Sequence, residues 1–243
     1  YGMYKVLAGI NAIENREVLL TTDFEANVPK ILESVDDRTK LIFICSPNNP
    51  TGNSFQKKNV VQLLESFHGL VVVDEAYIDF SNQESWLTGL KDYPNLIVAQ
   101  TLSKAYGLAG IRLGICYASE EIIAILNKIK PPYNVNQLTQ QKAVQRVNNQ
   151  DAVQQEIMQI LAERDVLMKA LKTLDYVEKV YPSDANFILA KVDGADKRYQ
   201  QLLEKQVVVR NRSSQPLCEN TLRFTVGTSE ENKLLIAILK ELN

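Results

Sequence analysis

The sequence predicts an α/β protein whose large N-terminal part contains a mostly parallel sheet and whose smaller C-terminal part is α+β. Two observations support this prediction. Short apolar runs alternate with helix-period segments through the first half of the chain, and a strand, helix, strand, strand, helix order follows a long amphipathic stretch. Continuous apolar strands that alternate with helices are typical of a parallel sheet covered on both faces.

In the first part, strands are expected where short apolar runs occur, at residues 18–20, 41–45, 70–73 and 96–99. Helices are expected between them, at about 28–34, 57–67 and 84–91. Apolar residues recur at helical spacing over about 138–174, which predicts one long amphipathic helix.

In the second part, strands are expected at about 185–192, 207–210 and 221–226, with helices near 195–205 and from Glu230 onward. We therefore expect a large domain at residues 1–172 and a small domain at 173–243, linked by the long helix.

Composition excludes several classes of function. The chain has 243 residues, 45% apolar content and a net charge of −2, as an ordinary soluble globular protein has. The absence of a Lys/Arg cluster argues against a nucleic-acid partner, and the apolar runs are too short to span a membrane. Cys45, Cys116 and Cys218 are an odd number and widely spaced, which favours a reducing cytoplasm. A single histidine disfavours Ser-His-Asp hydrolysis and histidine-based zinc sites, so no metal site is predicted.

Three motifs follow directly after predicted strands. They are Ser-Pro-Asn-Asn-Pro-Thr-Gly at 46–52, Asp-Glu-Ala-Tyr at 74–77 and Ser-Lys-Ala-Tyr-Gly-Leu-Ala-Gly-Ile-Arg at 103–112. The carboxyl ends of strands in an open α/β sheet meet at one crevice, so the motifs should converge there. They supply an amide, a carboxylate, a phenol, an amine and a guanidinium, which are the groups that pyridoxal phosphate needs. The sequence therefore predicts a pyridoxal-phosphate site.

Lys104 is the predicted catalytic residue. It lies on a loop after an apolar strand among small and hydroxyl residues, where partial desolvation would free its amine as a nucleophile. An isolated Ser-Lys pair is usually a solvated surface feature. The presence of Thr101 and Arg112 nearby in the sequence favours an active-site lysine instead.

Further residues are expected to hold the cofactor. Thr101, Ser103 and Arg112 would bind its phosphate through hydroxyl and guanidinium groups; a strand end and a surface charge are the alternative interpretation. Asp74 follows four apolar residues and would pair with the ring nitrogen, unless it is only a helix cap.

Tyr77 and Asn49 would face the ring hydroxyl, although the Asn-Asn-Pro-Thr-Gly segment also fits a simple turn. The Asn49-Pro50 bond is expected to be cis, because a tight cis turn could direct the amide inward.

In this order and spacing the motifs resemble the fold-type I pyridoxal-phosphate aminotransferases. Segments 1–4, 103–114, 183–187 and 209–212 resemble, more narrowly, the histidinol-phosphate aminotransferases. The resemblance implies transfer of an amino group between L-glutamate or 2-oxoglutarate and imidazole-acetol phosphate or L-histidinol phosphate, in histidine biosynthesis. It also implies a cytoplasmic homodimer.

The resemblance assigns three more roles. Lys104 would be the Schiff-base residue and general base, and Tyr1 would stack on the cofactor ring. Arg223, whose guanidinium suits a bidentate contact, would bind a substrate carboxylate. Arg210 would contact the substrate phosphate, with Arg212 as its competitor and a solvated edge-strand charge as the alternative for either.

The chain opens on Tyr1 without a targeting pattern, so we expect it to begin mid-protein. The family's segment that donates backbone hydrogen bonds to the cofactor phosphate, an N-terminal arm and a tyrosine from the partner subunit are expected upstream. Four alternatives remain: an aromatic or broad-range aminotransferase, a threonine-phosphate decarboxylase, a noncatalytic fragment, and a nucleotide-binding protein, which would need a Gly-rich phosphate loop that the sequence lacks.

Overall fold

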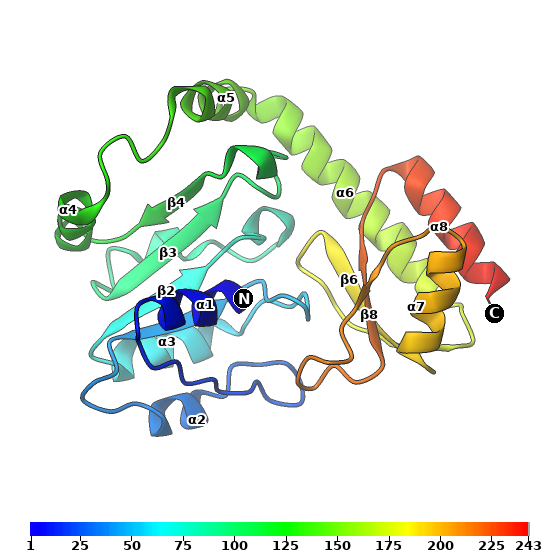
Figure 1. Ribbon diagram of the computed structural model, residues 1–243, viewed down its shortest axis with the longest axis horizontal. Helices are drawn as coiled ribbons and strands as arrows, with labels where there is room; N and C mark the ends of the chain where they lie inside the picture. Colours follow the sequence, from blue (N-terminus) through cyan, green and yellow to red (C-terminus); the bar gives the residue numbers. More distant parts are fainter. Residues whose placement is uncertain (243) are drawn as a thin grey trace.

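The computed structural model describes residues 1–242 and contains two four-stranded sheets connected by a long helix (Figure 1). The first sheet has the order β1-β2-β3-β4, in which β1, β2 and β3 are parallel and β4 is antiparallel to β3. The predicted mostly parallel sheet is therefore confirmed. Its strands are β1 (Leu41–Cys45), β2 (Leu70–Asp74), β3 (Leu96–Thr101) and β4 (Gly114–Tyr117).

Helices α2 (Val28–Glu33) and α3 (Lys57–Ser66) cover one face of this sheet. The apolar residues of β1 and β2 that point to this face, such as Ile42 and Val71, form the core with Val60 and Leu63. On the other face of β1, Phe43 is 45% exposed, and so is Leu41. The expected cover on both faces is thus incomplete at β1, where within residues 1–242 the ring of Tyr4 stacks on Phe43 at 4.7 Å.

The second sheet has the order β5-β6-β8-β7 and is antiparallel throughout. Its strands are β5 (Val177–Val180), β6 (Phe187–Val192), β7 (Arg210–Asn211) and β8 (Thr221–Thr225), and its helices are α7 (Ala195–Glu204) and α8 (Ser229–Glu241). Leu171, Leu202 and Leu239 are almost fully buried in its core. This half has the expected α+β character, and the boundary near residue 172 stays a prediction.

The single helix predicted over 138–174 is wrong: the structure has α5 (Gln137–Val147) and α6 (Gln150–Leu171). Asn148 and Asn149 separate them, and asparagine competes with helical hydrogen bonding through its own side chain. Helix α6 still spans the distance between the two sheets (Figure 1).

Other boundaries differ from the prediction. Residues 18–20 form no strand, because no neighbouring segment among the described residues pairs with them. The helix expected at 84–91 is only the 3-10 turn η2 (Trp86–Gly89), whose first turn is capped by Ser85. The strand expected at 207–210 is reduced to the two-residue β7, because only Arg210 and Asn211 pair with β8. Strand 185–192 begins at Phe187, since the Ser183 hydroxyl binds the backbone of Ala185 in a turn.

Several elements were not predicted. They are α1 (Gly2–Ile10), η1 (Ile78–Phe80), η3 (Ala109–Ile111), β4, α4 (Glu120–Ile129) and β5. Helices α1 and α4 contain no buried residue, although both have amphipathic sequences that the prediction missed. None of the helices in residues 1–242 is both long and apolar enough to cross a membrane.

Candidate active site

The three sequence motifs meet at the carboxyl edge of the first sheet. Cys45 and Asp74 are register partners at the ends of β1 and β2, and Asp74 pairs in turn with Ala99 of β3. Backbone hydrogen bonds continue beyond the strands, with Ser46 N donating to Asp74 O at 3.0 Å and Glu75 N donating to Ala99 O at 2.8 Å. The side chains that follow the strands therefore share one edge, as the parallel topology requires.

The first motif forms a closed turn with two cis bonds, Ser46-Pro47 and Asn49-Pro50, so the expected cis bond is confirmed. Gly52 adopts a left-handed φ of +83°, and its carbonyl accepts a 2.7 Å hydrogen bond from the backbone of Asp184. The side-chain oxygen of Asn49 accepts a 2.7 Å hydrogen bond from Arg223. This turn is thus joined to strand β8 of the second sheet and to the segment that precedes β6.

Asp74 is half-buried at the end of β2. One of its carboxylate oxygens, Oδ1, accepts a 3.0 Å hydrogen bond from the backbone N–H of Ala76, which closes a local turn. The other, Oδ2, accepts a hydrogen bond from the hydroxyl of Tyr4. The carboxylate therefore caps the following turn and also presents an oxygen to the site.

Tyr77 is buried, and burial is the largest cause of the rise in its pKa above the ordinary value. The positive charge of Arg223 acts in the opposite direction. The ring of Tyr77 meets the edge of Phe187 with centroids 5.2 Å apart, and the Lys104 Nζ atom lies 5.3 Å from the Tyr77 centroid. The structure thus brings Lys104 and Tyr77 together.

The desolvation expected for Lys104 is not present, because its side chain is exposed. In the turn after β3, Leu102 and Ala105 point into the core and Lys104 lies on the opposite, open side. The amine is therefore accessible to a ligand that enters the site.

The expected phosphate-binding hydroxyls form a small cluster. Thr101 Oγ1 donates to Ser103 Oγ at 2.9 Å and accepts a 3.1 Å hydrogen bond from the backbone of Ser103. Leu113 O lies within 3.4 Å of Thr101 Oγ1, which places the neighbouring Arg112 close by. The Arg112 guanidinium is exposed and donates to Ala109 O at 2.7 Å; among the described residues no hydrogen bond joins it to Thr101 or Ser103.

Three arginines lie along the second sheet near the first motif. Arg210 and Arg223 are register partners on β7 and β8, and Arg212 continues on the same side two residues beyond. Burial lowers the pKa of Arg223, and the charges of Arg212 and then Arg210 lower it further. The Nε atoms of Arg212 and Arg223 are buried without a partner, whereas Arg210 is exposed. Buried guanidinium groups normally have anionic or polar partners, so this cluster suits an anionic ligand.

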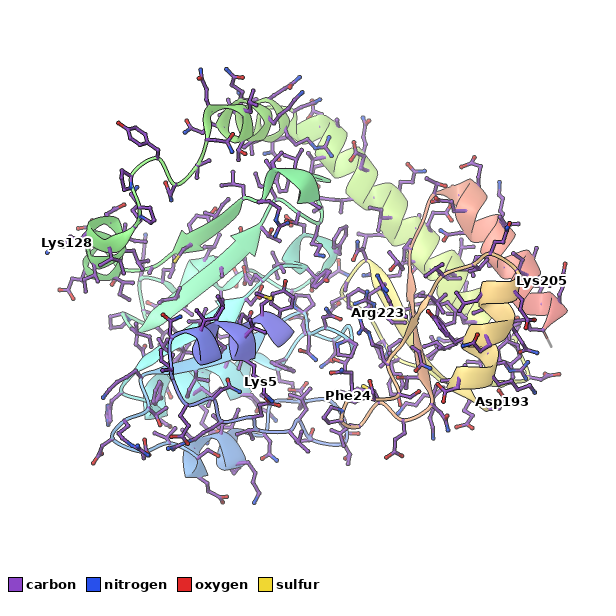
Figure 2. The ribbon with its side chains drawn as sticks, in the orientation of Figure 1. Lys5, Phe24, Lys128, Asp193, Lys205 and Arg223 are labelled. Carbon is purple, nitrogen blue, oxygen red and sulfur yellow. The ribbon has the colours of Figure 1, made fainter. Side chains whose placement is uncertain are left out.

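The strand position of Arg223 agrees with the alternation expected from the sequence. Its neighbours Leu222 and Phe224 are each 1% exposed in the core, so Arg223 points away from that core. The structure places it on β8, between the two sheets (Figure 2). Its guanidinium also lies over the ring of Phe187, 4.7 Å from the centroid.

At the N-terminus, Tyr1 is 65% exposed, and its α-amino group lies 4.0 Å from the Cys45 sulfur. The tyrosine that reaches Asp74 is Tyr4, which sequence reasoning did not single out. Tyr1 is the N-cap of α1 and Tyr4 lies three positions later within it, a spacing that brings two side chains to one side of a helix. That spacing was the available signal.

These residues fit pyridoxal phosphate by the chemistry of their donors. Lys104 offers an accessible amine for the aldehyde, and Asp74 offers a carboxylate for the ring nitrogen. A phenol and an amide are available for the ring hydroxyl, from Tyr77 and Asn49, and the hydroxyl pair of Thr101 and Ser103 for the phosphate.

Comparison with known proteins points to the same cofactor. The sequence profile described as aminotransferase class I and II matches residues 1–239. Histidinol-phosphate aminotransferase of Flavobacterium johnsoniae is 67% identical over 243 residues, which are 100% of this chain and 70% of that protein. The enzyme of the same name from Parabacteroides distasonis is 50% identical over 242 residues, again 100% of this chain and 70% of that protein.

Among solved structures, the histidinol-phosphate aminotransferase of Clostridium acetobutylicum superposes with a TM-score of 0.92 at 23% identity, covering 100% of this chain and 75% of that one. The Sinorhizobium meliloti histidinol-phosphate aminotransferase, solved in complex with pyridoxal-5'-phosphate, gives a TM-score of 0.87 at 22% identity, covering 100% and 69%. These likenesses show the fold, and the sequence matches show the family. The chain is therefore a member of the class I and II aminotransferases, which depend on pyridoxal phosphate.

Proposed function

We propose that this chain is part of an aminotransferase that moves an amino group between L-glutamate and imidazole-acetol phosphate, producing 2-oxoglutarate and L-histidinol phosphate in histidine biosynthesis. The observation that carries the proposal is the contact between Arg223 and Asn49, which brings an anion-binding arginine to the cofactor residues. The curated relatives, which are 50% to 67% identical, bear the name of this activity.

The chain's own residues would hold the cofactor as follows. Lys104 binds its aldehyde covalently, and Asp74 pairs with the ring nitrogen. Tyr77 and Asn49 bind the ring hydroxyl, and Tyr1 stacks on the ring. The phosphate-binding residues are Thr101, Ser103 and Arg112.

Bound pyridoxal phosphate supplies an electron sink that stabilises negative charge at the substrate Cα. The Lys104 amine would take the proton from the substrate Cα and deliver it to the aldehyde carbon of the cofactor, which is general acid–base catalysis by a positioned group. Its exposed position above the Tyr77 ring leaves it free to make this transfer.

The arginine cluster would recognise the substrates. Arg223 binds the carboxylate of glutamate or 2-oxoglutarate in a bidentate contact, a geometry that guanidinium groups favour. For the substrate phosphate, Arg210 was the first candidate from the sequence. Arg212 competes strongly, because its buried Nε has no partner and its charge acts more on the pKa of Arg223 than that of Arg210 does.

A cytoplasmic homodimer is part of the proposal. The cytoplasmic location is supported by the three cysteines Cys45, Cys116 and Cys218, which are free in the structure of residues 1–242. The homodimer rests on the family resemblance alone. Size-exclusion chromatography with light scattering would test the dimer directly.

The first experiment is a visible-absorption titration of the chain with pyridoxal phosphate, followed by borohydride reduction and peptide mapping. A saturable band, with the label on Lys104 and lost in Lys104→Ala, supports the proposal. Lys128→Ala is the matched control, since Lys128 lies on α4 in the neighbouring part of the chain and is exposed. Absence of a band would favour the noncatalytic-fragment alternative for this chain.

A second candidate follows from the same arginines. A cluster that suits a phosphate and a carboxylate also suits the substrate of a threonine-phosphate decarboxylase. Incubation of the loaded protein with each substrate, scoring amino product against carbon dioxide, separates the two. A panel of aromatic amino acids tests the broad-range alternative in the same assay.

A further inference from the structure

The hydroxyl of Tyr4 donates a hydrogen bond to Oδ2 of Asp74, the oxygen that is not engaged by the backbone of Ala76. The same hydroxyl lies 3.6 Å from the Cys45 sulfur. We propose that Tyr4 is a positioning residue, which holds the Asp74 carboxylate in the orientation that receives the ring nitrogen of the cofactor. This inference rests on the proposed function, in which Asp74 is the partner of that nitrogen.

The packing around the Tyr4 ring supports this role. The ring stacks on Phe43 of β1 with centroids 4.7 Å apart and planes 29° apart, and the edge of the Tyr1 ring meets it at 5.6 Å. Tyr4 and Ala8 are the two residues of α1 that are not exposed, and Tyr4 is the one whose side chain reaches Asp74. An aromatic ring fixed on both sides places its hydroxyl with little rotational freedom.

Tyr4 keeps its proton in this environment. Burial, followed by the nearby Cys45 and Asp74, raises the pKa of its phenol far above the ordinary value. A neutral phenol donates to a carboxylate, and hydrogen bonds to an ionised acceptor are about twice as strong as neutral ones. The neutral phenol therefore donates to the Asp74 carboxylate and adds no second negative charge beside it.

The contact also leaves room for the cofactor. A carboxylate has about four acceptor positions, and Asp74 uses one for Ala76 N and one for the Tyr4 hydroxyl. Acceptor positions therefore remain for the ring N–H. The competing interpretation is that the hydroxyl occupies the place of the ring nitrogen and must leave when the cofactor binds, and the two interpretations predict opposite effects of removing it.

The test compares pyridoxal-phosphate titrations of the unchanged chain and the Tyr4→Phe variant, which retains the ring that packs on Phe43. We expect binding about tenfold weaker, the usual effect of losing a hydrogen bond to a charged group, and a shifted absorbance maximum of the bound cofactor. Tyr93→Phe, which removes a phenol hydroxyl far from Asp74, should bind like the unchanged chain. Unchanged or tighter binding by Tyr4→Phe would overturn the inference.

A second measurement needs no cofactor. A double-mutant cycle with Tyr4→Phe and Asp74→Ala, measured by urea unfolding, reports the coupling between the two side chains. We expect the effects on the unfolding equilibrium constant to deviate from additivity by about fivefold or more. If the two effects are additive, the inference is wrong. The proposed function still stands in that case, provided that the unchanged chain binds pyridoxal phosphate normally. Failure of the unchanged chain to bind, with the coupling present, would count against the proposed function instead.

Discussion

The Nη1 atom of Arg223 donates a 2.7 Å hydrogen bond to the Oδ1 atom of Asn49, although the two residues are 174 positions apart in the sequence. Arg223 belongs to β8 of the second sheet, and Asn49 follows β1 of the first. The bond therefore connects a residue proposed to bind the substrate with one proposed to bind the cofactor. A change at either residue should affect both functions.

The first prediction concerns Arg223→Gln. This variant loses the bidentate charge and should raise KM for glutamate and 2-oxoglutarate about tenfold to a hundredfold, with a smaller effect on kcat. Steady-state kinetics of each half-reaction measure the effect. Arg38→Gln is the control, because Arg38 is exposed and, within residues 1–242, its ion pairs are with the surface carboxylates of Glu14 and Asp36. An unchanged KM in Arg223→Gln would remove Arg223 from the substrate site.

The second prediction concerns Gly52→Ala. A Cβ at this position would lie 2.8 Å from Ser183 Oγ and 3.2 Å from its Cβ, and the φ of +83° already disfavours a side chain. The variant should lose about 1–3 kcal/mol of unfolding free energy and bind pyridoxal phosphate more weakly, since the turn that carries Asn49 must shift. Gly9→Ala, in a helix with open space around it, should be neutral or slightly stabilising. Urea unfolding of both variants tests the prediction. A Gly52→Ala variant as stable as the unchanged chain would contradict it.

The third prediction concerns Glu75, which is 1% exposed beside Asp74. Its carboxylate accepts 2.6 Å hydrogen bonds from Ser85 Oγ and Trp86 N and a 2.9 Å hydrogen bond from Gln100 Nε2. Glu75→Gln directs an NH₂ group toward donors and should lower the unfolding free energy by about 1–3 kcal/mol. The exposed Glu84→Gln is the control. The two urea midpoints should differ, and coincident midpoints would show that Glu75 is not needed as an acceptor.

The fourth prediction is a pH dependence. Hydrogen bonds from Arg198 hold the pKa of Asp193 below its usual value, with Nε to Oδ1 at 2.8 Å and Nη2 to Oδ2 at 2.7 Å. Since the folded pKa is lowered, the stabilisation is present above the unfolded value of about 3.9 and is lost as pH falls through the lower folded pKa. Unfolding midpoints of Asp193→Asn should therefore depend less on pH below about pH 4 than those of the unchanged chain. Asp37→Asn, at an exposed position, is the matched control.

Much of the first sheet was predictable from the sequence. The apolar runs at 41–45, 70–73 and 96–99 become β1, β2 and β3, because short continuous apolar runs that alternate with helical segments are typical of the strands of a parallel sheet. The polar motifs that follow each run then had to share one edge. The cis Asn49-Pro50 bond and the direction of Arg223 were likewise accessible from turn chemistry and strand alternation.

Other features were not accessible. Helix α4 has an amphipathic sequence and a capping Ser119, so its signal was present and was missed, whereas β4 has four residues that alternate between exposed and half-buried and offers little pattern. The run at 18–20 has strand composition but finds no partner among the described residues, and pairing is a tertiary property. The exposure of Lys104 depends on which side of the turn faces the core, which composition does not specify.

The sequence by itself determined the chemistry of this protein: the amine, carboxylate, phenol, amide and guanidinium groups, their order along the chain, and the strands whose ends carry them. This was possible because burial and turn formation act on neighbouring residues. The tertiary structure decided which groups touch. The contacts of Arg223 with Asn49 and of Tyr4 with Asp74 join segments 174 and 70 positions apart. Such contacts arise from the packing of whole elements, and no local pattern of residues encodes them.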